Sequence, residues 1–341
     1  MYEKNKGYVI VTDYVQPDTK ADLSDALQEL ILANPHKTIF FPDGEYALSK
    51  PICTPADPNK SVALELANYA VIKPTAEWNS DEALIRLGGV EPFNSISIIG
   101  SNYYLRGGII DGCGIAAGIS IDSGRETSIK QVSIKNTTIG INIKRGANNG
   151  SSDADIYDVN IVGNGKAGSI GVLVEGFDNT LSNMRIACVQ YGVKFLGGGN
   201  SLRNIHPLYI FSPELTEVYR DSVAFQELAG GNWYSFCYSD QFALGFETTQ
   251  RSKSVYSDCY AMWYTAKGDK QVGWEAKKKF NSVLRNCSVN FHGDSKPEFN
   301  AYIKVAEEGG AGVIDTPLFR EELVGDKTYE KYLRGPIVFP R

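Results

Sequence analysis

Apolar and polar positions follow one short unit through most of this chain. An apolar residue is followed by two others, then a second apolar residue, and often a third apolar residue two positions further on. The clearest copies begin at Ile129, Ile156, Leu181, Leu202, Tyr234, Tyr256 and Leu284. From Val132 onward, the second apolar positions follow one another at intervals of 21 to 32 residues. A repeat of this length, built from short alternating segments, is typical of a solenoid whose stacked repeats bury one shared core.

A second unit, Gly-apolar-x-apolar, falls between the copies of the first, for example at Gly140, Gly171 and Gly192. Short strands joined by glycine-rich turns favour parallel coils over hairpins. Parallel connections of this kind are almost always right-handed. We therefore predict an all-β chain that folds as a right-handed parallel β-helix (a solenoid) over residues 51–314.

The two ends of the chain depart from the repeat. Leu23, Leu27, Leu30 and Ile31 lie at helical spacing, which predicts an amphipathic helix within residues 1–50. Because the end repeats of a solenoid need covering, we expect this segment to be an N-terminal capping helix with a first strand. The charged tail, residues 315–341, is expected to cover the other end or to reach a neighbouring chain. The prediction is one structural domain with a cap at each end.

Composition narrows the classes of partner. The 341 residues carry a net charge of -6 without a basic stripe, which argues against nucleic acid. No apolar run reaches the ~18 residues of a membrane span. The first 14 residues lack the apolar core of a signal peptide, so the chain as given is expected in the cytoplasm, or secreted if a leader was trimmed. Three His and six Cys without a Cys-x-x-Cys pair predict no metal site.

Three stretches resemble a known superfamily. They are Val11-Thr12-Asp13-Tyr14, Phe40-Phe41-Pro42-Asp43-Gly44-Glu45-Tyr46 and Ile109-Ile110-Asp111-Gly112-Cys113-Gly114. They resemble the entry module and a coil of the pectate-lyase-like, polygalacturonase-related (glycosyl hydrolase family 28-related) β-helix proteins. The resemblance implies a saccharide-active protein, in a group of lyases, glycoside hydrolases, fructan-processing transferases, epimerases and phage tailspikes. The Asn-Thr-Asp, Asp-Asp, Gly-His-Gly and Arg-Ile-Lys patterns of polygalacturonases are missing, so the resemblance leaves the mechanism open.

The repeat predicts which side chains face outward together. The residue after each second apolar position should point away from the core, which places Arg185, His206, Tyr238 and Tyr260 in one ladder. With coils about 4.8 Å apart, this ladder would be about 14 Å long. Asp240 follows on the same face. Aromatic rings stack on sugars, arginine binds carboxylates, and His or Asp can move protons, so these residues predict a sugar-binding strip. Trp263 belongs to the same concentration of aromatic residues.

Two further carboxylates stand out. Alignment of residues 228–232 with 196–200 places Glu227 opposite the inward-facing Phe195, where it is either a structural group or a general acid with a raised pKa. The longest interval of the repeat holds an extra loop, residues 211–221, which ends at Asp221 and could form one wall of a cleft.

These residues lead to several hypotheses of function, each with a poly- or oligosaccharide as partner. The preferred one is a glycoside hydrolase without a cofactor, which uses a pair of carboxylates. Its catalytic candidates are Asp240, Asp221, Glu227 and His206, and its substrate-binding candidates are Arg185, Tyr238, Tyr260 and Trp263. The second is a lyase acting on uronic acids, which could involve Ca²⁺ and would abstract a proton with Arg185, His206 or Tyr238. The others are a fructan-processing transferase, whose relatives form homotrimers, and a non-catalytic, tailspike-like saccharide-binding protein.

Overall fold

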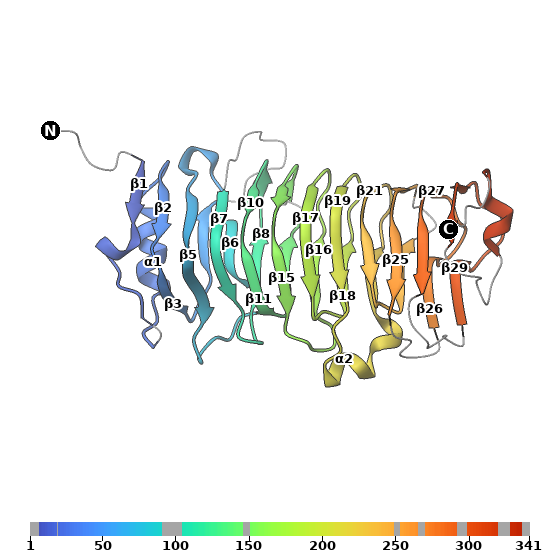
Figure 1. The fold of residues 1–341 in the computed structure, drawn as a ribbon. Helices are drawn as coiled ribbons and strands as arrows, with labels where there is room; N and C mark the ends of the chain where they lie inside the picture. The colour runs from blue at the N-terminus through green and yellow to red at the C-terminus, as the bar shows by residue number, and fades with distance from the viewer. Residues whose placement is uncertain are drawn as a thin grey trace. The chain divides into compact units, whose positions relative to one another are not determined.

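The computed structural model describes residues 7–18, 20–90, 104–145, 151–248, 253–264, 270–291, 299–319 and 328–335. The chain divides into two compact units. Unit 1 comprises Met1–Asn164 with Glu175–Thr180, and unit 2 comprises Gly165–Val174 with Leu181–Arg341. In each unit short strands pair in parallel with strands one coil away in the sequence (Figure 1).

Unit 1 has two principal sheets. The first contains β1 (Tyr8–Ile10), β2 (Thr38–Phe41), β3 (Gly44–Leu48), β5 (Ala63–Pro74), β7 (Tyr104–Asp111), β10 (Ser128–Lys130), β11 (Ser133–Thr137), β14 (Asp155–Tyr157) and β15 (Asn160–Gly163). The second contains β4 (Ile52–Pro55), β6 (Ala83–Val90), β8 (Ala117–Ile121) and β12 (Ile139–Ile143). A small pair joins β9 (Gly124–Arg125) to β13 (Ser151–Ser152).

Unit 2 repeats the arrangement. Its first set of strands comprises β17 (Thr180–Ala187), β19 (Ser201–Leu208), β21 (Trp233–Ser235), β22 (Tyr238–Asp240), β24 (Val255–Ser257), β25 (Tyr260–Trp263), β27 (Val283–Arg285), β28 (Ser288–Phe291), β30 (Val313–Asp315) and β31 (Leu318–Phe319). The second comprises β16 (Ile170–Val174), β18 (Tyr191–Phe195), β20 (Val223–Glu227), β23 (Leu244–Thr248), β26 (Lys270–Ala276) and β29 (Phe299–Val305). A short helix, α2 (Pro213–Glu217), and the 3₁₀ turn η3 (Tyr219–Asp221) interrupt the coils.

A left-handed residue explains the spacing of the repeat. The third position of each unit has a positive φ, as in Asp158 (56°), Asn204 (52°) and Asp258 (55°). This single residue turns the chain, so that the apolar residues on both sides of it point inward although they are three positions apart. Asparagine and aspartate enter this conformation more readily than other residues with a side chain, which accounts for their frequency at this corner.

The inward column predicted from the repeat is confirmed. Its members are at most 1% exposed: Val132, Val159, Met184, Ile205, Cys237, Cys259 and Cys287. In unit 2 the core also contains stacked aromatic rings, because equivalent positions of adjacent coils lie directly above one another. Phe225 and Phe246 have ring centroids 4.7 Å apart, and Phe246 and Trp274 are 4.8 Å apart. The three cysteines are therefore core residues.

The first helix lies where the spacing predicts it. Helix α1 (Ser24–Leu32) buries Leu27 and Ile31 completely, and the Gln28 side chain donates to the Cys53 carbonyl oxygen of β4 at 2.9 Å. Its role as a cap stays a prediction. Single 3₁₀ turns occur at η1 (Val11–Asp13), η2 (Pro58–Lys60) and η4 (Thr328–Tyr332).

The repeat continues into the predicted tail. Strand β31 pairs with β28, and Thr316 before it has the left-handed φ of the earlier corners. Residues 320–327 and 336–341 of the tail lie outside the described residues.

The prediction of a parallel β-helix is confirmed, since in each unit two sets of parallel strands alternate around an apolar core. Among the described residues, no helix is long and apolar enough to cross a membrane.

Candidate functional site

The outward strip predicted in unit 2 lies on one face of neighbouring strands. Tyr238 of β22 pairs with Tyr260 of β25, and Asp240 pairs with Leu208 of β19. Arg185, on β17, is exposed and lies close enough for its charge to act on Tyr238. The structure thus brings four of the predicted substrate-contacting or catalytic residues, together with His206, onto one face.

His206 and Asp240 form the polar centre of this strip. The His206 Nε2 atom lies 3.5 Å from the Asp240 Oδ2 atom, and the two side chains are 15% and 11% exposed. Among the described residues, the His206 Nε2 and Asp240 Oδ1 atoms are buried and have no hydrogen-bond partner. Buried polar atoms are normally satisfied, so these two unsatisfied atoms distinguish His206 and Asp240 from the rest of the strip.

The aromatic rings of the strip stack on one another. The His206 and Tyr238 ring centroids are 3.7 Å apart, and those of Tyr238 and Tyr260 are 4.6 Å apart with an interplanar angle of 3°. The stacked faces cannot receive a sugar ring, contrary to the expectation of sugar stacking along the ladder. Burial raises the pKa of Tyr238, the Asp240 charge adds to this effect, and the Arg185 charge opposes it. The strip therefore offers ring edges and hydroxyl groups.

A second site in unit 2 is a cavity of about 400 Å³ on the outer side of β18, β20, β23 and β26. Its lining includes Asp221, Glu247 and Glu275, three carboxylates that come from η3, β23 and β26. Glu247 and Glu275 are register partners on neighbouring strands and are only 6% and 4% exposed. This cavity gathers several carboxylates in one hollow, as a carboxylate-pair mechanism requires.

Lysines hold the two glutamates. The Lys277 Nζ atom lies 2.9 Å from the Glu275 Oε2 atom and 3.9 Å from the Glu247 Oε2 atom. One lysine therefore lies within ion-pair distance of both glutamates. Lys304 also contacts Glu275, at 3.1 Å. Burial lowers the pKa of Lys277, but the hydrogen bond and charge of Glu275, with the charges of Glu247 and Asp221, outweigh burial and raise it. Lys277 is therefore held protonated beside the pair.

Tyr191 lines the same cavity as Asp221 and Glu247. Burial raises the pKa of its hydroxyl, and the charges of Asp221 and Glu247 raise it further. Its ring packs against Val223 and Leu244, which are buried at the base of the cavity. The cavity thus combines an apolar base with a hydroxyl group that two carboxylates influence.

The extra loop places Asp221 in this cavity. The Tyr209 hydroxyl donates to the Leu215 carbonyl oxygen of α2 at 2.5 Å, and the Tyr209 ring packs edge-on against Tyr219 at 5.3 Å. The Ser212 hydroxyl caps α2 by accepting from the Leu215 amide at 3.1 Å. These contacts fix the loop so that Arg220 and Asp221 line the cavity, as the prediction of a cleft wall anticipated.

Glu227 lies inside the coils. It pairs in register with Phe195, as predicted, and is fully buried. Its Oε1 atom accepts hydrogen bonds from Asn232 Nδ2 (3.0 Å), Tyr234 Oη (2.8 Å) and Ser254 Oγ (2.7 Å). A saccharide in solvent cannot reach this carboxylate. Of the two predicted roles, the geometry therefore favours a structural group over a general acid.

Trp263 is also remote from solvent. It is 1% exposed, and its Nε1 atom donates to the Phe242 carbonyl oxygen at 2.6 Å. Its ring is therefore not available to a sugar. The candidate residues thus separate into three places: the strip, the cavity with Asp221, and the interior with Glu227 and Trp263.

Sequence reasoning missed Glu247 and Glu275. Both occupy the x position of Gly-apolar-x-apolar copies, Gly245-Phe246-Glu247 and Gly273-Trp274-Glu275. That position points outward and is half-buried as Lys194 in the earlier copy. The available signal was that two successive copies carry glutamate at the same outward position. Like charges on neighbouring strands are unfavourable without a partner, so such a pair indicates a local role for the two carboxylates.

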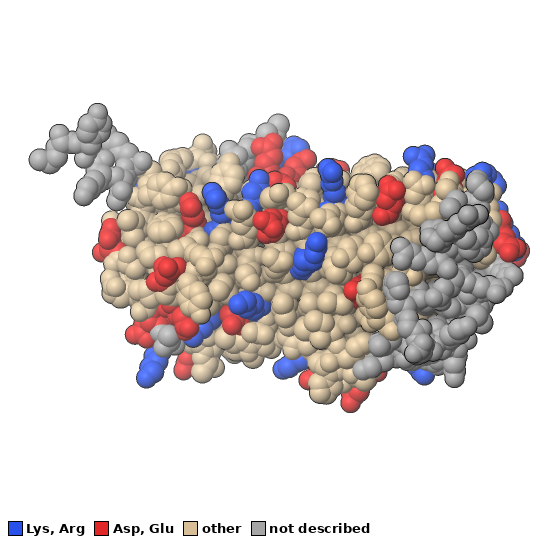
Figure 2. Space-filling view, in the orientation of Figure 1, with Lys and Arg blue, Asp and Glu red and all other residues tan. Residues whose placement is uncertain are grey.

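Charges of both signs are interspersed on the face of the molecule in Figure 2. Within the described residues, no group of three or more His, Cys, Asp or Glu side chains is placed to hold a metal ion.

No family model and no curated protein matches this chain. Solved structures do match. A mutant tailspike protein of E. coli bacteriophage HK620, in complex with a pentasaccharide, matches 94% of this chain with a TM-score of 0.64 and 12% identity. ORF18 of Geobacillus virus E2 matches 92% with a TM-score of 0.62 and 15% identity. The catalytic domain of a GH87 alpha-1,3-glucanase, in complex with tetrasaccharides, matches 91% with a TM-score of 0.54 and 12% identity.

This chain spans 64%, 62% and 59% of those three structures. At such low identities the likeness shows the fold, the parallel β-helix. The finer resemblance to polygalacturonase-related proteins stays a prediction.

Proposed function

We propose that this protein hydrolyses glycosidic bonds of a poly- or oligosaccharide in the cavity lined by Asp221, Glu247 and Glu275. The observation that carries this proposal is that three carboxylates line one cavity, with Glu247 and Glu275 as register partners on neighbouring strands and Asp221 supplied by the extra loop. Glycoside hydrolysis in most families needs two such carboxylates on opposite sides of the bond.

In this mechanism one of Asp221 and Glu247 is the general acid and the other is the general base. One carboxyl group gives its proton to the leaving glycosidic oxygen as the carbon–oxygen bond breaks. The other takes a proton from the water that forms the new bond to carbon. Glu275 contacts Lys277 and Lys304, and this ion pairing holds Lys277 beside Glu247. The apolar base formed by Val223 and Leu244 suits the C–H face of a sugar ring.

Two structural neighbours support a saccharide as substrate. The HK620 tailspike structure contains a pentasaccharide, and the GH87 glucanase structure contains tetrasaccharides. Fold does not determine function, so the cavity, rather than the likeness, carries the proposal.

The test uses Asp221→Asn and Glu247→Gln, with Glu217→Gln as the matched control. Glu217 is exposed on α2, outside the lining of the cavity. On a polysaccharide that the wild-type protein cleaves, release of reducing ends should fall by about 10²- to 10⁴-fold for each cavity variant. The control should keep its activity. Cleavage that survives in both cavity variants, or a wild-type protein inactive on a broad polysaccharide panel, contradicts the proposal.

A second candidate is lyase chemistry at the strip. Its support is the His206 ring, whose Nε2 atom lies 3.5 Å from Asp240 and whose face stacks on Tyr238, together with the exposed cation of Arg185. A uronic-acid polymer would then lose a proton next to its carboxyl group to His206 or Tyr238. Incubation with alginate and polygalacturonate should raise ultraviolet absorbance through the unsaturated product, and His206→Ala should abolish the rise. No absorbance change on either polymer rejects the lyase.

A further inference from the structure

Unit 1 has a groove of about 600 Å³ that none of the candidate residues above lines. It crosses the outer face of β5, β7, β11 and β15, together with the corners that precede β11 and β15. The register joins these strands in sequence, since Leu66 pairs with Gly107, Ile109 with Ser133, and Ser133 with Asn160. Four successive coils therefore contribute to it, which gives a length of about 14 Å.

A local irregularity opens this groove. The pairing of β5 with β7 shifts register between Leu66 and Val71. On β7, Gly107 and Gly108 have φ values of 78° and 67°, a left-handed conformation that favours glycine. A Cβ atom on Gly107 would lie 2.3 Å from the Leu66 carbonyl oxygen, so a side chain there is excluded. Two consecutive positions of the lining are thus backbone only.

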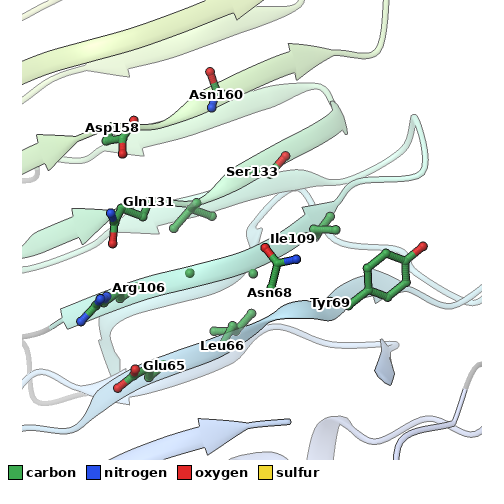
Figure 3. A pocket seen from close by; sticks show the side chains of 13 residues that line it. Glu65, Leu66, Asn68, Tyr69, Arg106, Ile109, Gln131, Ser133, Asp158 and Asn160 are labelled. Atoms are coloured by element: carbon green, nitrogen blue, oxygen red, sulfur yellow. The ribbon is translucent and has the colours of Figure 1, made fainter. Parts of the chain in front are cut away.

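Polar side chains stand along both sides of the groove (Figure 3). One row contains Glu65, Arg106, Gln131 and Asp158, and the other contains Asn68, Ser133 and Asn160 beside the apolar Ile109. In the part of the chain that the structure describes, the side chains of Arg106, Gln131, Asp158, Asn68, Ser133 and Asn160 make no hydrogen bond or ion pair. Glu65 accepts one hydrogen bond, from the Tyr8 hydroxyl at 3.2 Å. Apart from Glu65, the polar side chains of both rows are therefore unpaired within the described residues, and a ligand can use them.

The chemistry of these rows identifies a class of ligand. Amide, carboxylate and guanidinium groups each present two coplanar polar atoms, which match a pair of neighbouring hydroxyl groups. One Arg shares its row with two acidic residues, Glu65 and Asp158, so the lining does not favour a polyanion. Tyr69, which is 65% exposed, stands at one end and offers a ring face.

We propose that this groove is a binding site for a neutral oligosaccharide, separate from the hydrolytic cavity. The site goes beyond the proposed function, because it lies in the other unit and uses none of the residues assigned to catalysis. Its role is to hold a glycan chain by hydrogen bonds from both rows without reaction.

The experiment measures binding of cellotetraose, maltotetraose and chitotetraose by calorimetry, with tetragalacturonate as the acidic comparison. Asn68→Ala and Asn160→Ala each remove one amide from a row, and Asn59→Ala removes an exposed amide outside the groove as the matched control. Each groove variant should weaken binding about tenfold, the effect of one to two lost hydrogen bonds. Ser133→Trp should fill the groove and abolish binding, and thermal unfolding checks that it folds.

Binding of a neutral tetrasaccharide that Ser133→Trp removes and Asn59→Ala leaves intact supports the proposal. Failure of all three neutral tetrasaccharides to bind, stronger binding of tetragalacturonate, or binding that Ser133→Trp does not change overturns it. The hydrolytic variant Glu247→Gln separates the two proposals. It should keep groove binding although its release of reducing ends is strongly reduced, so either proposal can fail while the other stands.

Discussion

Glu227 gives the most direct test of the interior of unit 2. Its buried Oε1 atom accepts hydrogen bonds from Asn232 Nδ2, Tyr234 Oη and Ser254 Oγ. The network extends further, because Ser254 Oγ accepts from the Asn232 amide and Asn232 Oδ1 accepts from the Asn200 amide, each at 3.0 Å. Replacement by alanine removes the acceptor that three buried donors share.

The expected cost follows from these three donors. A buried donor left unsatisfied costs about 1–3 kcal/mol, and part of this is recovered when a hydroxyl rotates to another acceptor. We therefore expect Glu227→Ala to lower the free energy of unfolding by about 3–5 kcal/mol. Glu227→Gln keeps the size and one carbonyl acceptor, so its expected cost is about 1–2 kcal/mol.

Urea unfolding of both variants, followed by tyrosine and tryptophan fluorescence, measures these costs. Glu217→Ala is a suitable control, since Glu217 is exposed on α2. A loss below about 1 kcal/mol for Glu227→Ala would refute the reasoning, because such a small value is typical of a surface substitution. The folded Glu227→Gln variant should keep whatever saccharide activity the wild-type protein has, whereas a general acid would lose it.

Three other predictions concern the rest of the coils. Burial raises the pKa of Asp22, but hydrogen bonds from Ser24 and Ser49 outweigh burial and hold the pKa well below 3.8. The contribution of Asp22 to stability is therefore present above pH 3.8 and lost as pH falls. Asp22→Asn should flatten this acid dependence in thermal unfolding, and an unchanged profile would contradict the assignment. Gly171→Ala would place a methyl group 2.5 Å from the Gly192 carbonyl oxygen and should lower the unfolding free energy by about 1–3 kcal/mol, whereas a neutral effect would show that the coil can shift. Cys259 is fully buried, and burial raises the pKa of its thiol. A thiol reagent should therefore modify the exposed Cys113 in the native protein and reach Cys259 only after unfolding. Labelling of Cys259 in the native protein would disprove its core position.

Much of the fold could be predicted because the repeat carries its own register. The inward position of Cys237 and Cys259 and the outward position of Tyr238 and Tyr260 follow from alternation alone. The corner residue could not be predicted as easily, since Phe236 occupies it with a φ of 55° where most coils have Asn, Asp or another polar residue. The Phe236 amide donates to the Ser257 carbonyl oxygen of the next coil at 3.1 Å, a contact that the side-chain pattern does not reveal.

The candidate sites were harder to predict because position on a strand does not say what a ring or carboxylate meets. Tyr238 faces outward as expected, but its faces are covered by His206 and Tyr260. Asp221 and Asp240 were candidates for one pair, yet Asp221 lines the cavity over β20 and β23, while Asp240 belongs to β22 in the other set of strands. Which sheet a loop reaches depends on the contacts of Tyr209 and Tyr219, and these do not follow from spacing.

Parallel stacking itself favours ladders of similar residues, because equivalent positions of adjacent coils lie side by side. Such ladders stabilise the coils when the residues are aromatic or apolar, as in Phe225, Phe246 and Trp274. For Glu247 and Glu275 the same geometry brings two negative charges together, which is unfavourable unless cations such as Lys277 offset it. A third carboxylate enters their cavity only because the loop at residues 211–221 interrupts the repeat. Chemistry in this fold is therefore expected where an insertion adds a residue that the repeat alone would not place there.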